Sequence, residues 1–187
     1  EEIKENLSIE NVEIRTEDSE DVVSYIQKKD SEWISIELNE EIKKVHGDIK
    51  RIYKNKMDEL RKYGMTKPIS LITKKDLLML QLRFRNEINN KNPAAYSGIV
   101  ITSQLLKLDH ILELIETQTL TGALKFMEKL KDDPSKSAKS LIKESWYINC
   151  YNKLNNLILN GLDNPKLIKL TEIIKEQLEA NPKSKII

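Results

Sequence analysis

The longest apolar stretch of the chain runs from residue 92 to residue 118. Its first fifteen residues include no charged side chain, and apolar residues occupy every side of a helix drawn through them. A helix that is apolar all round must be buried, so this segment predicts the central helix of a helical core. It is too short, and too rich in Ser, Thr and Gln, to cross a bilayer. Asn92 and Pro93 predict its start, because Asn caps helices and Pro favours the first helical position.

Amphipathic segments predict the helices that pack against the central one. Apolar residues recur at helical spacing through residues 39–63, 73–89, 122–131, 141–159 and 164–181. Asn39 and Asn164 are typical N-terminal caps, and Thr73 with Asp76 resembles a capping box. The segment 73–89 contains more Leu than one buried face needs, so we expect it to be covered on two sides.

Two short segments near the beginning alternate apolar and polar residues, which is the period of a strand. They are residues 11–16 and residues 31–38. Two short strands do not form a stable sheet by themselves. We therefore expect them, together with residues 185–187, to belong to flanking domains. The predicted fold is mainly α: a helical bundle-like domain around a central buried helix, with short β segments at the termini.

Composition agrees with this fold class and indicates a compartment. Five Gly and five Pro among 187 residues are typical of a helix-rich soluble protein. Cys150 is the only cysteine, which excludes an internal disulfide and favours an intracellular, cytoplasmic location. No basic and apolar leader begins the chain, so secretion is not indicated. The missing initiator Met suggests a fragment of a longer protein.

The net charge of +1 hides a strong asymmetry along the chain. Residues 1–41 include 14 acidic and 4 basic side chains, whereas residues 42–91 include 14 basic and 5 acidic ones. Such asymmetry points to an anionic partner. Lys outnumbers Arg 26 to 5, which suits contact with phosphates better than bidentate reading of base edges.

The first long predicted helix arranges many of these cations on one side. At about 100° per residue, its lysines and arginines fall in a narrow stripe and beside it. A polyanion would relieve their mutual repulsion and release its counterions. Two alternatives stay open, a Lys-rich solvated surface and a surface for an acidic protein segment. The predicted principal phosphate contacts are Lys43, Lys50, Lys54 and Arg61, assisted by Lys44, Arg51, Lys62, Lys74 and Lys75.

Catalytic chemistry is not indicated. None of the five glycines is followed five residues later by another, so the chain has no phosphate-binding loop. The two histidines share no short motif with Cys150, whereas a zinc site needs three or four ligands. Asp109, Glu113 and Glu116 share one helix face and could hold a metal, although a solvated surface is the simpler interpretation. We therefore expect no catalytic residue, metal or cofactor in this chain.

Three stretches resemble a known family. Residues 6–26, NLSIENVEIRTEDSEDVVSYI, resemble the segment that leaves the first helicase domain of archaeal Hef and its FANCM-type relatives. Residues 108–118, LDHILELIETQ, followed by ALKF, are similar to the central helix of that family's insert domain. Residues 161–170, GLDNPKLIKL, and the ending PKSKII resemble the beginning of its second helicase domain. The matches follow in order, so the resemblance covers nearly the whole chain.

The resemblance implies a helical insert between the two RecA-like domains of a superfamily 2 helicase. Residues 1–38 would be the edge of the first helicase domain with a linker, residues 39–162 the insert, and residues 163–187 the start of the second domain. In this family the insert is associated with branched or forked DNA in replication-fork repair, and the RecA-like pair hydrolyses ATP. ATP and Mg²⁺ are thus expected only for the intact parent, and this fragment is not expected to be an enzyme.

Two other functions remain open. One is a helical protein-interaction module that docks an acidic partner, including the acidic segment of its own chain. The other is a double-stranded RNA-binding insert of an RNA-sensing helicase relative, since such enzymes carry helical inserts at the same place. The expected partners are branched or forked DNA and the flanking RecA-like domains in cis, with no membrane.

Overall fold

The structure is a computed structural model that describes residues 2–25, 31–89 and 91–186. Contacts within the chain divide it into two compact units, Glu1–Ser35 and Ile36–Ile187. The predicted domain boundaries after residues 38 and 162 stay a prediction. Among the described helices, none combines the length and the apolar content needed to cross a membrane.

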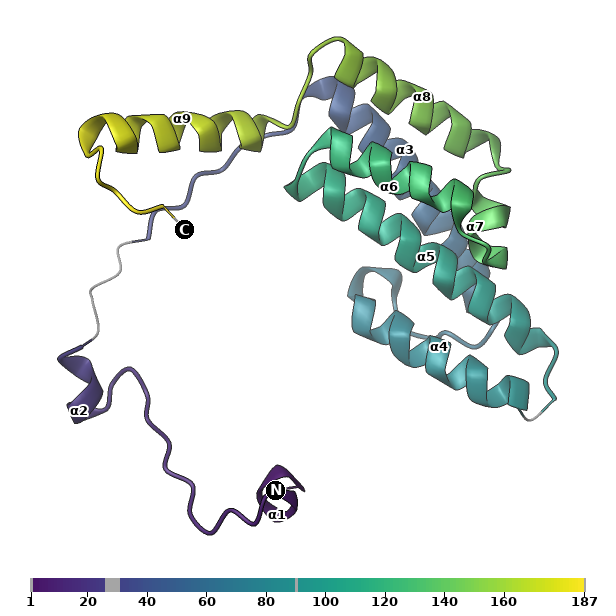
Figure 1. Ribbon diagram of the computed structural model, residues 1–187. Coiled ribbons are helices and arrows are strands. Elements are labelled where there is room, and N and C mark those ends of the chain that lie inside the picture. Colours follow the sequence, from purple (N-terminus) through teal and green to yellow (C-terminus); the bar gives the residue numbers. More distant parts are fainter. Residues whose placement is uncertain (1, 26–30, 90, 187) are drawn as a thin grey trace. The chain divides into compact units, whose positions relative to one another are not determined.

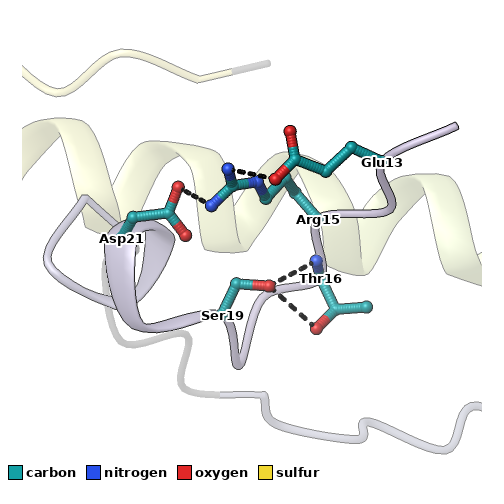
Figure 2. A network of polar contacts seen from close by, with 5 residues as sticks. All are labelled: Glu13, Arg15, Thr16, Ser19 and Asp21. Carbon is teal, nitrogen blue, oxygen red and sulfur yellow. Dashed lines mark hydrogen bonds and ion pairs between the residues drawn. The ribbon is translucent and has the colours of Figure 1, made fainter. Parts of the chain in front are cut away.

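The first unit contains two short helices, α1 (Glu2–Asn6) and α2 (Glu20–Val23). Between them, the Arg15 guanidinium donates to Glu13 at 2.5 Å and to Asp21, and the Ser19 hydroxyl accepts from the Thr16 N–H at 2.9 Å (Figure 2). All of these contacts span six residues or fewer, so they stabilise a local turn rather than a core.

The strands predicted over residues 11–16 and 31–38 do not form, so this part of the prediction is wrong for the described residues. A strand needs a neighbouring strand to receive its backbone hydrogen bonds and a layer to bury one face. Here Val12 is 62% exposed and Trp33 96% exposed. Residues 185 and 186 form no strand either, and residue 187 lies outside the described residues.

The second unit is a helical bundle organised around one helix. Its elements are α3 (Glu40–Arg61), a 3₁₀ turn (Ile69–Leu71), α4 (Lys74–Asn89), α5 (Ala94–Thr117), α6 (Leu120–Asp132), α7 (Lys136–Leu141), α8 (Ser145–Leu159) and α9 (Pro165–Ala180). In Figure 1, α5 runs between α4 on one side and α6 on the other, and it contacts α3, α4, α6 and α7. The prediction of a mainly α fold with a buried central helix is confirmed.

Two hydrophobic clusters fill the bundle, and α5 contributes to both. The first joins the beginning of α3 to the second half of α5, α6 and α8, with Ile42 and Ile111 fully buried. The second joins the end of α3 to α4 and the first half of α5 around Phe84, which is 1% exposed. Gly98 of α5 faces the Phe84 ring, and a Cβ there would lie 2.7 Å from Cζ. The absence of a side chain at Gly98 thus lets α4 approach α5 closely.

The predicted caps begin α3 and α4 as expected, whereas α5 begins one residue later than predicted, at Ala94, with Pro93 as its N-cap residue. The Asn39 side chain accepts from the Glu41 N–H at 2.9 Å at the start of α3. Before α4, Asp76 Oδ2 accepts from the Thr73 N–H at 2.7 Å and Thr73 Oγ1 accepts from the Asp76 N–H at 3.3 Å, which is a capping box. These side chains satisfy N–H groups that have no partner inside the helix.

Asn164 links the start of α9 to the end of α5. Its Oδ1 accepts from the Lys166 N–H at 3.0 Å, as predicted for a cap, and its Nδ2 donates to the Ile115 carbonyl at 2.8 Å. Its side chain is fully buried. One amide therefore satisfies a helix end and a buried carbonyl together.

Two expectations need correction. The helix predicted over residues 141–159 begins at Ser145, because the polar segment before it forms the separate helix α7 and the chain turns at Glu144. The two-sided covering expected for α4 is wrong among the described residues, since Leu78, Met79 and Leu82 are at least half exposed. Leu77 and Phe84 are buried on the side that faces α5, with Leu80 and Ile88 partly buried beside them, whereas Leu78, Met79 and Leu82 point outward.

Candidate nucleic-acid interface

The stripe predicted along α3 lies mostly on its exposed side. Ile42, Ile49 and Leu60 are fully buried, which turns the opposite side of α3 to solvent. Lys50, Lys54 and Arg61 are exposed and Lys43 is half-buried. Hydrophobic periodicity alone fixes this orientation, because the apolar residues of α3 recur every three or four positions.

Two of the four principal cations carry carboxylate partners. Lys43 Nζ lies 2.9 Å from Glu37 and 3.0 Å from Glu40, and the hydrogen bonds that it donates to these carboxylates raise the pKa of Lys43. Arg61 pairs with Asp58 at 3.6 Å. Asp58 lies three residues before Arg61, so it interrupts the positive surface.

Two of the cations beside the stripe, Lys44 and Arg51, are also paired. Lys44 Nζ lies 2.6 Å from Glu41, and the hydrogen bond that it donates to this carboxylate raises the pKa of Lys44. Arg51 lies 2.7 Å from Asp48, and Lys153 of α8 approaches the other oxygen of the same carboxylate at 2.7 Å. The result on this side of α3 is an alternation of charges.

Lys50 and Lys74 face a hollow of about 420 Å³ between α3, the start of α4 and α5. Carboxylates of α5 line it, and Glu113 lies 3.6 Å from Lys74. Burial raises the pKa of Asp109 in this hollow, and a hydrogen bond from His110 lowers the pKa of Glu113. In the described part of the chain, no group of His, Cys, Asp and Glu is arranged to hold a metal ion.

Four of the nine predicted contacts are exposed and form no ion pair with any described carboxylate: Lys50, Lys54, Lys62 and Lys75. The other five share a surface with carboxylates. Exposed ion pairs contribute only about 0–1 kcal/mol, so phosphates can replace these partners at little cost. The four unpaired cations lie on α3, at its C-cap and at the start of α4.

The sequence could have revealed some of these carboxylates but not all. Asp48 and Asp58 lie three residues from their partners on α3, so helical spacing predicts both pairs. Glu113 is 39 residues from Lys74 and meets it only because α5 packs beside the beginning of α4.

Comparison with known proteins supports one family throughout the chain. Residues 22–156 match the family described as "Putative ATP-dependent RNA helicase, helical bundle". The protein described as "Putative ATP-dependent RNA helicase MJ1505" of Methanocaldococcus jannaschii is 35% identical over 191 residues, which is 100% of this chain and 23% of that protein. The "DEAD-box ATP-dependent RNA helicase FANCM" of Arabidopsis thaliana is 24% identical over 97% of this chain and 14% of its own length.

The fold has a counterpart among solved structures. The crystal structure of the Pyrococcus furiosus Hef helicase domain matches with a TM-score of 0.73 and 30% identity, covering 98% of this chain and 40% of that one. The chain thus spans less than half of each relative. It belongs to this helicase family, as the helical insert domain of a Hef- and FANCM-like helicase.

Proposed function

We propose that this domain contacts the phosphate backbone of branched or forked DNA for an ATP-dependent superfamily 2 helicase that acts in replication-fork repair. The observation that carries the proposal is the set of exposed cations on α3 and at the start of α4 with no described ion-pair partner. A phosphate backbone neutralises such a set without any base-specific contact. Recognition then follows the shape of the DNA rather than its sequence.

Binding of a forked DNA to the 187-residue chain tests this proposal. We expect substitution of Lys50, Lys54, Lys62 and Lys75 by Gln to weaken binding at least tenfold. The slope of log affinity against log salt should become shallower by about 0.9 for each phosphate contact removed. The matched control carries the same charge change at four exposed lysines elsewhere: Lys166, Lys175, Lys183 and Lys185. Equal losses in both variants would mean that only net charge matters, and unchanged binding in the first would remove these four lysines from the interface.

Double-stranded RNA is the second candidate ligand. Two relatives, MJ1505 and FANCM, are described as RNA helicases. A competition between forked DNA, linear duplex DNA, single-stranded DNA and duplex RNA separates the candidates. Preference for the fork supports the proposal, and preference for duplex RNA replaces it. Failure to bind any of the four favours the acidic protein partner.

The proposal extends to the parent protein. We expect ATP and Mg²⁺ to bind the RecA-like domains that flank the insert in cis. The parent is assigned to the cytoplasm, where a lone thiol such as Cys150 stays reduced. ATP hydrolysis by the intact parent, stimulated by forked DNA, tests the first assignment.

A further inference from the structure

Three lysines lie on one side of α7 and of the turn after it. Lys136 and Lys139 are three residues apart and so share one side of α7, Lys143 follows two residues after the end of α7, and all three are exposed. The opposite side of α7 is fully buried through Ala138 and Leu141 and contacts α5 and α6. We call the three lysines the α7 stripe.

The carboxylates nearest to the α7 stripe in sequence hold other partners. No Asp or Glu occurs between Asp133 and Glu144. Asp133 accepts from the Ser135 N–H at 2.8 Å and pairs with Lys107 at 3.3 Å, and Glu144 pairs with Lys56 at 3.0 Å. Among the described residues no carboxylate forms an ion pair with the α7 stripe, which is therefore less neutralised than the stripe of α3.

The contact between Glu144 and Lys56 fixes the side of α3 on which the end of α7 lies. Lys56 follows Lys54 by two residues, so the two side chains leave α3 about 200° apart around its axis. Lys54 is exposed, whereas the side chain of Lys56 is only 18% exposed. The α7 stripe and the stripe of α3 thus occupy different sides of the bundle. A straight duplex laid along one side leaves the other stripe free.

Resting on the DNA binding proposed above, we propose that the α7 stripe binds the phosphate backbone of a second duplex arm of a branched DNA. Lys136 and Lys139 are about 4.5 Å apart along the axis of α7 at 1.5 Å per residue, and Lys143 follows in the turn after its end. Phosphates of one strand recur about every 3.4 Å along a duplex. Lys136 and Lys139 can therefore contact neighbouring phosphates of one strand, Lys143 can extend this contact from the turn, and the exposed Ser140 hydroxyl lies on the same side of α7 as a further donor.

Two contact surfaces on different sides give the domain a physical means to prefer a junction. The stripe of α3 contacts one arm, and the α7 stripe gains a ligand only where another arm leaves the branch point. Lysine suits this task, because its compact ammonium contacts phosphates without reading bases. A linear duplex satisfies only one surface at a time.

The test compares a forked DNA with a linear duplex of the same length, using fluorescence anisotropy and the 187-residue chain. Substitution of Lys136, Lys139 and Lys143 by Gln should weaken fork binding about tenfold or more and change linear-duplex binding less than threefold. The salt dependence on the fork should become shallower by about 0.9 for each contact removed. Substitution of Lys50, Lys54 and Lys62 by Gln should weaken both ligands. Substitution of Lys166, Lys175 and Lys183 by Gln is the matched control.

The outcomes separate this proposal from the one on which it rests. If the unaltered chain binds no forked DNA, DNA binding itself is wrong and the second-arm proposal fails with it. If the unaltered chain binds the fork and the Gln variant of the α7 stripe binds it equally, only the α7 stripe is excluded. If the Gln variant loses equal affinity for the fork and for the linear duplex, the α7 stripe contributes only general electrostatic attraction and the second-arm proposal is wrong.

Cross-linking gives an independent readout that does not depend on affinity. Cys150 is 2% exposed and burial raises the pKa of its thiol to about 11, so a new exposed cysteine can be labelled selectively. A photo-cross-linker attached to a K139C variant should react with one arm of the fork, and one attached to a K54C variant should react with another. Reaction of both variants with the same arm would contradict the proposal.

Discussion

Replacing Gly98 by Ala should reveal how closely α4 and α5 pack. The new Cβ would lie 2.7–2.8 Å from three atoms of the Phe84 ring. Phe84 is 1% exposed and meets Tyr63 edge-on at a centroid distance of 6.5 Å, so the ring cannot move without disturbing the second cluster. Overpacking of this kind costs about 1–3 kcal/mol. Replacing a helical Gly by Ala contributes about 1 kcal/mol in the opposite direction.

Gly47 provides the matched control. It also lies within a helix, but a Cβ there would have nothing within 4 Å. Gly47→Ala should therefore show only the helix-propensity effect and stabilise the chain by about 0.5–1 kcal/mol. Gly98→Ala should be neutral or destabilising by up to about 2 kcal/mol, the difference between the overpacking cost and the propensity gain.

Urea unfolding followed by far-UV circular dichroism measures both changes as shifts of the midpoint at constant slope. A second variant, Phe84→Leu, removes ring atoms that the new methyl group would meet. In that background Gly98→Ala should cost less, and the coupling energy of the double-mutant cycle gives the size of the clash. A Gly98→Ala variant as stabilised as Gly47→Ala would refute this account of the packing.

Three further results are expected. Asn164→Ala should lower the free energy of unfolding by about 1–3 kcal/mol, because a buried carbonyl loses its donor. Asn181→Ala, at an exposed turn, should change the free energy of unfolding by less than urea unfolding resolves. Hydrogen bonds from Lys67 and from the capping box hold the pKa of Asp76 well below its ordinary value. The ionised carboxylate therefore stabilises the fold at neutral pH, and this stabilisation is lost as the pH falls from about 4 towards the lower folded-state pKa. Asp76→Asn should therefore be less stable than the parent at pH 7, and urea midpoints should show the two converging in acid. Cys150, whose pKa burial raises to about 11, should react with a thiol reagent at pH 8 only after denaturant unfolds the bundle, and a rapid reaction in native buffer would contradict its burial.

Much of the fold could be predicted because helices depend on local signals. Asn39, Thr73 and Asn164 begin helices in the structure, since each side chain accepts from an N–H close by in sequence. The uncharged segment predicts the buried helix α5, because burial excludes unpaired charges. The strand over residues 11–16 was wrong for the complementary reason. Alternating apolar and polar residues show only that one side of an extended segment is apolar. The segment forms a strand only when a second segment pairs with its backbone.

The candidate site was harder to predict because charge acts between elements. Helical spacing correctly groups Lys50 and Lys54 on the exposed side of α3, but it does not show that carboxylates of α5 line the hollow beside Lys50. The α7 stripe was missed because residues 135–140 are polar and carry too few apolar positions for a helix prediction. Packing of Ala138 and Leu141 against α5 and α6 decides its helical form.

Asn164 has a mechanical consequence. Since its amide joins the end of α5 to the beginning of α9, a rotation of α9 must either break a buried hydrogen bond or carry the bundle with it as one rigid body. When α9 and the bundle move together, the Ile115 carbonyl keeps its hydrogen bond to Asn164. A force applied to α9 is then transmitted to the helices that carry the two lysine stripes.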